Sequence, residues 1–313
     1  MAALLTTGSM AFAAGDQPQY PSATEAYRQG VKALKAGRAA AAVPALEYAA
    51  KRGVLGAQVK LARAYAAGRD VPKDDAKAFA YFEQIADQQA DINPSSPIAK
   101  YAAEAFVALG QYYLDGIPER PLAANPDYAA HLFRHAASYF GSAEAQYRLA
   151  RLYMNGTGVE KNIGLAVNWL AIAAKKQHAS AQATLGEILW RGEGVRERRA
   201  RGLALIILAR ENAHPDAKET QWIGALYEEV LSASDKAVRK DAEALLPALG
   251  GARASGLLPA AEAAPAEVLA APVQQDANAS PPETGLGPSA PPPAPIGLSV
   301  GFGGAPTVGD FKP

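Results

Sequence analysis

The sequence predicts an all-α solenoid, a stack of short helix pairs that runs from residue 20 to residue 250. Three observations carry this prediction. Apolar residues, mostly Ala and Leu, recur with the period of an α-helix, the same spaced set of residues recurs along the chain, and a glycine closes each set. We expect about twelve helices in this region, with few or no strands.

The repeated set consists of an alanine, a leucine, a second large apolar residue and a glycine at offsets of 0, 4, 8 and 11 residues. The first three offsets fall on one face of a helix and predict a buried stripe. Glycine accepts the left-handed backbone with which many helices end, so each helix is expected to stop there. The four copies are Ala57, Leu61, Tyr65 and Gly68; Ala105, Leu109, Tyr113 and Gly116; Ala145, Leu149, Tyr153 and Gly156; and Ala181, Leu185, Leu189 and Gly192.

A second apolar segment follows each copy, and one of these segments includes Trp169 at a core position. Asp74 and Asn162 are placed to cap two of these second helices at their N-termini. Each unit is thus a helix–turn–helix whose apolar face needs a neighbour, which is the logic of a solenoid. Pro94 and Pro97 lie in a longer gap between two units and predict an exposed turn.

Degenerate units are expected to open and close the array. Residues 27–53 resemble an opening helix pair, with Pro44 in the first turn of its second helix. Residues 218–249 are interpreted as a closing helix pair with Trp222 and Tyr227 on its apolar face.

The two ends of the chain differ in composition from the repeats. Residues 1–19 hold an uncharged, mostly small or apolar stretch, the small-x-small pattern Ala11-Phe12-Ala13 and a polar linker. We interpret them as an export signal that lacks its basic start, followed by the mature N-terminus; the alternative is a frayed, Ala-rich cytosolic terminus. Residues 251–313 hold 12 of the 23 prolines and only seven charged residues, which predicts a disordered tail rich in Pro, Ala and Gly.

Composition and motifs favour a binding protein over an enzyme. Acidic and basic residues balance at 31 each, which gives no reason to expect nucleic acid or an anionic membrane as partner. Cysteine is absent, so disulfides, thiolate metal sites and cysteine nucleophiles are excluded. No later apolar stretch approaches the length of a membrane span. No Walker loop, G-x-S-x-G elbow or H-E-x-x-H helix occurs, so we expect no catalytic site, cofactor or metal.

One pattern resembles a metal site. Asp127, His131 and His135 are spaced four residues apart on one helix face, where two His and an Asp could hold zinc. We favour a solvated polar face instead, with Asp127 near the helix N-terminus for electrostatic reasons. A further hypothesis is pH sensing, in which protonated His131 and His135 repel each other and change a binding face.

A basic cluster surrounds one repeat turn and is interleaved with Glu193 and Glu197. A solvated loop is one interpretation of it, and a docking patch for an acidic partner surface is the other. The candidate partner-binding residues are Arg191, Arg196, Arg198 and Arg199, with Arg201 beside them.

The run from Ala145 to Val159, Ala-Gln-Tyr-Arg-Leu-Ala-Arg-Leu-Tyr-Met-Asn-Gly-Thr-Gly-Val, resembles the first helix and turn of the Sel1-like repeat. This repeat is a relative of the tetratricopeptide repeat. The resemblance covers about two-thirds of the chain and implies a helical solenoid that acts by binding another protein.

Within the repeats, five segments resemble the ExoR family of alphaproteobacterial exopolysaccharide regulators: 45–50, 77–87, 105–110, 116–118 and 136–141. This resemblance implies a periplasmic protein that represses a two-component system by holding the periplasmic domain of a sensor histidine kinase inactive. A rival hypothesis is a general cell-envelope scaffold that assembles secretion or cell-wall machinery. A third, from another class, is a hydrolase with an unrecognised carboxylate pair.

Overall fold

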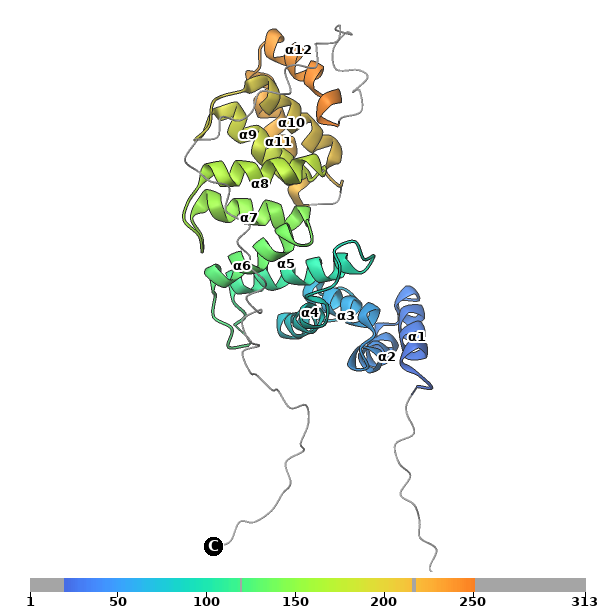
Figure 1. Cartoon of the computed structure of the whole chain (residues 1–313). Coiled ribbons are helices and arrows are strands. Elements are labelled where there is room, and N and C mark those ends of the chain that lie inside the picture. Colours follow the sequence, from blue (N-terminus) through green and yellow to red (C-terminus); the bar gives the residue numbers. More distant parts are fainter. Residues whose placement is uncertain (1–19, 119, 216–217, 251–313) are drawn as a thin grey trace, which may run out of the picture. The chain divides into compact units, whose positions relative to one another are not determined.

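A computed structural model of the chain describes residues 20–118, 120–215 and 218–250. Within these residues the chain forms twelve α-helices, a short 3-10 helix and no strand (Figure 1). An isolated antiparallel bridge joins Ile117 to Leu122. The predicted all-α fold is confirmed. The predicted export signal and the predicted tail, residues 1–19 and 251–313, lie outside the described residues.

The helices are short and closely spaced along the chain. None of those that the structure describes is long and apolar enough to cross a membrane. In order they are α1 (Ala23–Lys35), α2 (Ala39–Lys51), α3 (Leu55–Ala67), α4 (Asp75–Gln89), α5 (Ala99–Asp115), α6 (Pro126–Ser138), α7 (Ala143–Asn155), α8 (Ile163–Lys175), α9 (Ala179–Arg191), α10 (Arg199–Asn212), α11 (Lys218–Ala233), α12 (Lys236–Leu245) and the 3-10 helix η1 (Pro247–Leu249).

Helices that follow one another in sequence also pack against one another (Figure 1). The most extensive contacts lie within the pairs α1–α2, α3–α4, α5–α6, α7–α8 and α9–α10. Lighter contacts between α2 and α3, α4 and α5, α6 and α7, and α8 and α9 join each pair to the next. The closing pair differs, because both α11 and α12 contact α10. Each pair therefore buries its apolar face against its neighbours, as a solenoid requires.

The repeated set of apolar residues lies inside the repeats. Its four alanines, at positions 57, 105, 145 and 181, are completely buried, and its leucines are buried as well. Tyr65 is buried, whereas Tyr113, Tyr153 and Trp169 are half-buried and pack at the edges of the core clusters. The aromatic side chains thus cover the small residues at the centre of each helix pair.

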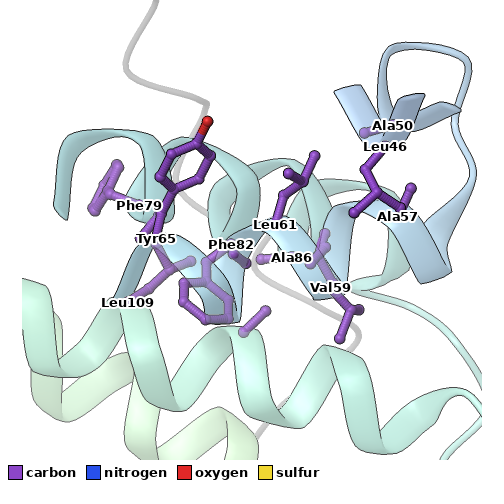
Figure 2. Packing of buried hydrophobic residues seen from close by; sticks show 14 of the residues in the cluster. Leu46, Ala50, Ala57, Val59, Leu61, Tyr65, Phe79, Phe82, Ala86 and Leu109 are labelled. Carbon is purple, nitrogen blue, oxygen red and sulfur yellow. The ribbon is translucent and has the colours of Figure 1, made fainter. Parts of the chain in front are cut away.

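Figure 2 shows that one apolar cluster extends over several helices in the first half of the array. Leu46 of α2, Leu61 of α3, Phe82 of α4 and Leu109 of α5 belong to this cluster. Because the cluster is continuous from pair to pair, no single pair contains a core of its own.

Glycines and polar caps determine where the helices begin and end. Gly68, Gly156 and Gly192 end α3, α7 and α9 in the left-handed conformation, with φ of 64°, 73° and 70°. Gly116 ends α5 at a φ of 73°. These positions suit glycine because a Cβ atom strains such a backbone.

The second helices of three units begin at a side-chain cap. Asp74, Asn125 and Asn162 precede α4, α6 and α8, and each accepts a hydrogen bond from the backbone N–H three residues further on, at 2.9 to 3.0 Å. The predicted caps at Asp74 and Asn162 are confirmed. Such a cap satisfies one of the N–H groups that a helix start leaves free.

The predicted turn between two units is present. Pro94 and Pro97 lie between the end of α4 and the start of α5, and the Ser95 N–H donates to Asn93 Oδ1 at 2.8 Å. The helix before the turn reaches Gln89, further than the repeat pattern indicated. The insertion is thus shared between a longer helix and a polar turn.

Two details of the outer units differ from the expectation. Pro44 lies in the second turn of α2, because that helix begins at Ala39. Trp222 is 37% exposed and is not on the apolar face of α11. The apolar residues of α11 recur every three or four positions and include Ile223 and Tyr227. Trp222 precedes Ile223 directly in the sequence, so its side chain points about 100° away from this apolar face.

Paired helices approach closely where α9 meets α10. A Cβ atom on Gly202 would lie 2.7 Å from the Gly186 carbonyl oxygen and 2.9 Å from the Trp190 nitrogen. Backbone atoms cannot move aside as the end of a side chain can, so even a methyl group forces the helices apart. Gly224 of α11 is also helical, but a Cβ atom there would meet nothing within 4 Å.

We predict opposite effects for alanine at these two glycines. Gly202→Ala should destabilise the protein by about 1–3 kcal/mol because of overpacking. Gly224→Ala should leave stability unchanged or raise it by up to about 1 kcal/mol, because alanine favours the helix. Thermal unfolding followed by circular dichroism measures both. Equal midpoints for the two variants would contradict the close approach of α9 and α10.

Candidate protein-binding surface

Three buried glutamines connect each repeat to the helix before it. Gln58, Gln146 and Gln182 each donate from Nε2 to a backbone carbonyl in the last turn of the preceding helix. The acceptors are the carbonyls of residues 50, 137 and 174, at 3.4, 3.1 and 3.2 Å. The Gln146 bond satisfies a carbonyl that has no donor within its own helix, whereas the carbonyls of residues 50 and 174 also accept a backbone N–H, from Gly53 and Gln177, at 2.9 Å each.

The sequence contains a signal for these glutamines that the spacing of the apolar residues does not include. Each stands one residue after the alanine that opens a repeat, in three of the four copies. In the remaining copy, which begins at Ala105, Phe106 stands at this position. A polar residue at a fixed core position indicates a hydrogen bond that recurs with the repeat.

Phe106 belongs to an aromatic cluster beside the turn between α4 and α5. The cluster also contains His135, Tyr139 and Phe140, and the His135 ring centroid lies 4.6, 5.3 and 5.4 Å from those of Phe106, Tyr139 and Phe140. Tyr139 is 41% exposed, so the cluster opens to solvent at one side. His135 Nε2 is buried and has no hydrogen-bond partner among the described residues.

The two histidines of the predicted pH-sensing pair have different surroundings. His131 is exposed next to Arg134, at 3.3 Å, whereas His135 is half-buried among aromatic rings. They therefore do not form one exposed polar face, because the helix turns His135 toward α5. Asp127 is exposed in the first turn of α6. Within the described chain no three His, Cys, Asp or Glu side chains are placed to hold a metal ion.

Polar side chains on the first helices of successive pairs contact one another. Arg63 of α3 donates to Glu104 of α5 at 2.6 Å, and Arg148 of α7 donates to Gln111 of α5. Arg191 of α9 lies 3.1 Å from Glu229 of α11. These charges are compensated within the chain, and such exposed pairs contribute only about 0–1 kcal/mol each.

Glu144 links α7 to the start of α9. His178 caps α9 by accepting the Ala181 N–H at Nδ1, 3.2 Å away, and its Nε2 lies 2.8 Å from Glu144 Oε2. Burial raises the pKa of Glu144, but the His178 hydrogen bond and the Arg148 charge outweigh it and lower the pKa overall. The start of α9 is thus held by a partly buried polar network.

The predicted partner-binding arginines divide into two groups. Arg191 pairs with Glu187 and Glu229, and Arg199 pairs with Glu197 at 2.7 Å. In contrast, Arg196 and Arg198 form no ion pair with any residue that the structure describes. The cluster therefore retains uncompensated positive charge at the turn between α9 and α10.

Arg201 adds to this charge. It lies in the first turn of α10, and its Nε atom is buried without a hydrogen-bond partner among the described residues. Burial lowers the pKa of the guanidinium, and the positive charge of Arg198 lowers it further. Arg198 itself begins α10 without a side-chain cap, unlike the residues that begin α4, α6 and α8.

Comparison with known proteins agrees with the helix pairs described above. The Sel1 repeat model matches residues 56–89, 103–138, 143–178 and 179–214. These ranges correspond to α3–α4, α5–α6, α7–α8 and α9–α10. The predicted four copies of the repeat are confirmed.

Two curated relatives extend the similarity beyond the repeat. The chain is 37% identical over 206 residues to the exopolysaccharide production negative regulator of Rhizobium meliloti (strain 1021), covering 66% of this chain and 74% of that protein. It is 36% identical over 219 residues to the regulator of the same name from Rhizobium leguminosarum bv. viciae, covering 70% and 79%. The chain belongs to this family of exopolysaccharide production negative regulators.

A solved structure shares the fold of this regulator-family chain. The Sel1 repeat protein from Oxalobacter formigenes aligns with a TM-score of 0.57 and 20% identity, covering 70% of this chain and 82% of that one. At this identity the similarity concerns the arrangement of helices alone. The same arrangement of helical repeats thus occurs in a separately solved protein.

We predict that the buried glutamine of the third Sel1 repeat stabilises the regulator-family fold. Gln146→Leu should lower stability by about 1–3 kcal/mol, because it leaves the Ala137 carbonyl buried without its donor. Gln221→Leu, on the exposed side of α11, is the matched control and should have little effect. Thermal unfolding measures both, and an unchanged midpoint for Gln146→Leu would contradict the role of the hydrogen bond.

We predict that His135 makes stability depend on pH. Burial lowers the pKa of His135 in the folded chain, although the Ala90 carbonyl and the charge of Asp91 oppose this. The unfolded chain therefore binds the proton more readily, and stability should fall as pH drops through about 6.5 toward more acidic values. Unfolding in urea at pH 7 and pH 5 measures this loss.

His135→Phe keeps the aromatic packing and should reduce the loss of stability between pH 7 and pH 5. His131→Gln changes the exposed histidine of the same helix and serves as the control. An equal loss in His135→Phe and in the unsubstituted chain would show that other groups cause the pH dependence.

Proposed function

We propose that this chain is a periplasmic protein that represses exopolysaccharide production by binding the periplasmic domain of a sensor histidine kinase. The observation that carries the proposal is the family membership, with 37% identity over 206 residues to a protein named as a negative regulator of this process. Those 206 residues amount to 66% of the chain, so the similarity extends beyond any single repeat.

The physical form of the chain supports a role in binding. Stacked helix pairs present a continuous surface built from many short elements, and such surfaces bind protein partners. Binding controls a partner only when the bound form of that partner differs from the free form in activity. Repression then follows if the chain binds the inactive conformation of the kinase more tightly than the active one.

The apolar residues near the N-terminus, with the small-x-small pattern at residues 11–13, support export. Export would place the repeats on the side of the membrane where a sensor domain is accessible. A fusion of the chain to alkaline phosphatase tests this location, because that enzyme is active only after export. An inactive fusion that is present at full length would overturn the periplasmic assignment.

We predict that deletion of the gene raises exopolysaccharide output and that a plasmid copy restores repression. Output is measured as secreted polysaccharide per cell. Purified chain should also bind the purified periplasmic domain of the kinase in titration calorimetry and lower kinase autophosphorylation in proteoliposomes.

Two results would overturn parts of this proposal separately. Unchanged polysaccharide after deletion would refute the regulatory role in this process. Altered polysaccharide without binding to the kinase domain would refute the proposed partner and favour the envelope scaffold, which crosslinking in the periplasm with partner identification would then test.

A further inference from the structure

The turn between α9 and α10 and the start of α10 contain several arginines close together in sequence. Arg196, Arg198 and Arg201 form no ion pair with residues that the structure describes, while the nearby Arg191 and Arg199 are paired within the chain. On the first helices, Arg63 and Arg191 contact a glutamate of the next pair, and Arg148 contacts Gln111 of the preceding pair. Arginines without an ion pair among the described residues are therefore neighbours at this turn.

The Arg201 guanidinium has no counterion among the described residues. Its Nε atom is shielded from solvent and has no acceptor among the described residues, and a second arginine, Arg198, lies close enough to lower its pKa. A partly buried cation without a counterion is unfavourable, because it has lost water and gained no acceptor. A carboxylate brought to this place would supply both the missing acceptor and the missing negative charge.

The start of α10 adds a backbone donor without a side-chain cap on the same residue. In α4, α6 and α8 the capping side chain accepts the N–H of the third residue after it. In α10 that third residue is Arg201, and Arg198 provides no acceptor. Among the described residues, the backbone N–H of Arg201 thus lacks a side-chain cap and its guanidinium lacks a counterion, and an incoming carboxylate could serve both groups.

The surroundings select a protein segment over other polyanions. Glu193 and Glu197 lie between the arginines, and they would repel a long, uniformly charged chain or an anionic membrane. Trp190 is half-buried beside the turn, with the Arg199 guanidinium 5.4 Å from its ring centroid. Arginine together with an accessible aromatic surface is typical of the energetic centre of a protein interface.

We propose that the turn between α9 and α10 is the docking site for a short acidic segment of the partner protein. The site contains Arg196, Arg198, Arg201 and Trp190. This inference rests on the proposed function, since it names the part of the chain that receives the partner. The segment places a carboxylate at Arg198 and Arg201 and an apolar side chain against Trp190. Arg191 contacts Glu229 of α11, and Arg199 pairs locally with Glu197.

The substitution Arg198→Asp tests the site without weakening the fold. Aspartate begins α4 in the same way at Asp74, where it caps the helix, so the variant should melt at the same temperature or higher. Binding should nevertheless weaken about tenfold or more, because a cation is replaced by an anion at the site of a carboxylate. Arg69→Glu, an exposed arginine just after α3, is the matched control and should change affinity less than twofold.

The measurement uses two probes so that this inference and the proposed function fail separately. One is the purified periplasmic domain of the kinase. The other is a fluorescein-labelled peptide of alternating Leu and Glu pairs, followed by anisotropy at low and physiological salt. The unsubstituted chain should bind the peptide more tightly than its Gln counterpart, with an affinity that falls as salt rises.

Loss of peptide and kinase binding in Arg198→Asp, with both retained in Arg69→Glu, supports the site. Binding of the kinase that is equal in all three proteins would overturn the docking site and leave the proposed function standing. Peptide binding that depends on Arg198 without any binding of the kinase would support the site and refute the kinase as partner. Equally tight binding of anionic vesicles or single-stranded DNA would overturn the assignment to a protein segment.

Discussion

Paired helices in this protein approach so closely that small residues are obligatory where they meet. A Cβ atom on Gly186 would lie 2.8 Å from the Gly202 carbonyl oxygen, and one on Gly110 would lie 2.6 Å from the Phe133 ring. The corresponding residues of the other two copies, Ala62 and Ala150, are completely buried. Because the backbones touch, the position of one helix fixes that of its partner, and the larger side chains fill the space on either side.

This packing has a consequence for polar groups at the helix ends. Closely packed pairs leave the last carbonyls of one helix covered by the next pair and away from water. The buried glutamines at positions 58, 146 and 182 donate to such carbonyls, so the same residue that packs in the repeat also joins it to the previous one. Stability in such an array depends on these junctions as much as on the pairs themselves.

The repeats deviate from their pattern at two places, and both are candidates for function. At the second Sel1 repeat, Phe106 replaces the glutamine and joins the aromatic cluster around His135. At the fourth, Arg198 replaces the capping Asp or Asn. A regular repeat needs neither change for folding. Among the described residues His135 Nε2 and Arg201 Nε lack a hydrogen-bond partner, as do the Oε1 atoms of Gln58 and Gln146 in the regular repeats. Departures from a repeat pattern that folding does not require are expected where a protein binds a partner.

The spacing of Ala, Leu and Gly by itself determined the helical repeats, because a helix with that stripe can bury it only against a neighbour. It also determined the glycine ends and the caps at Asp74 and Asn162, which depend on local backbone geometry. The tertiary structure decided what lies beyond one helix. It turned His135 inward while His131 stayed exposed, and it placed Trp222 outside the core. It also paired Arg191 with Glu229, while Arg196 and Arg198 have no acidic partner in the part of the chain that the structure describes. Which charge meets which depends on distances between residues of different helices, and a periodic sequence pattern contains no information on those distances.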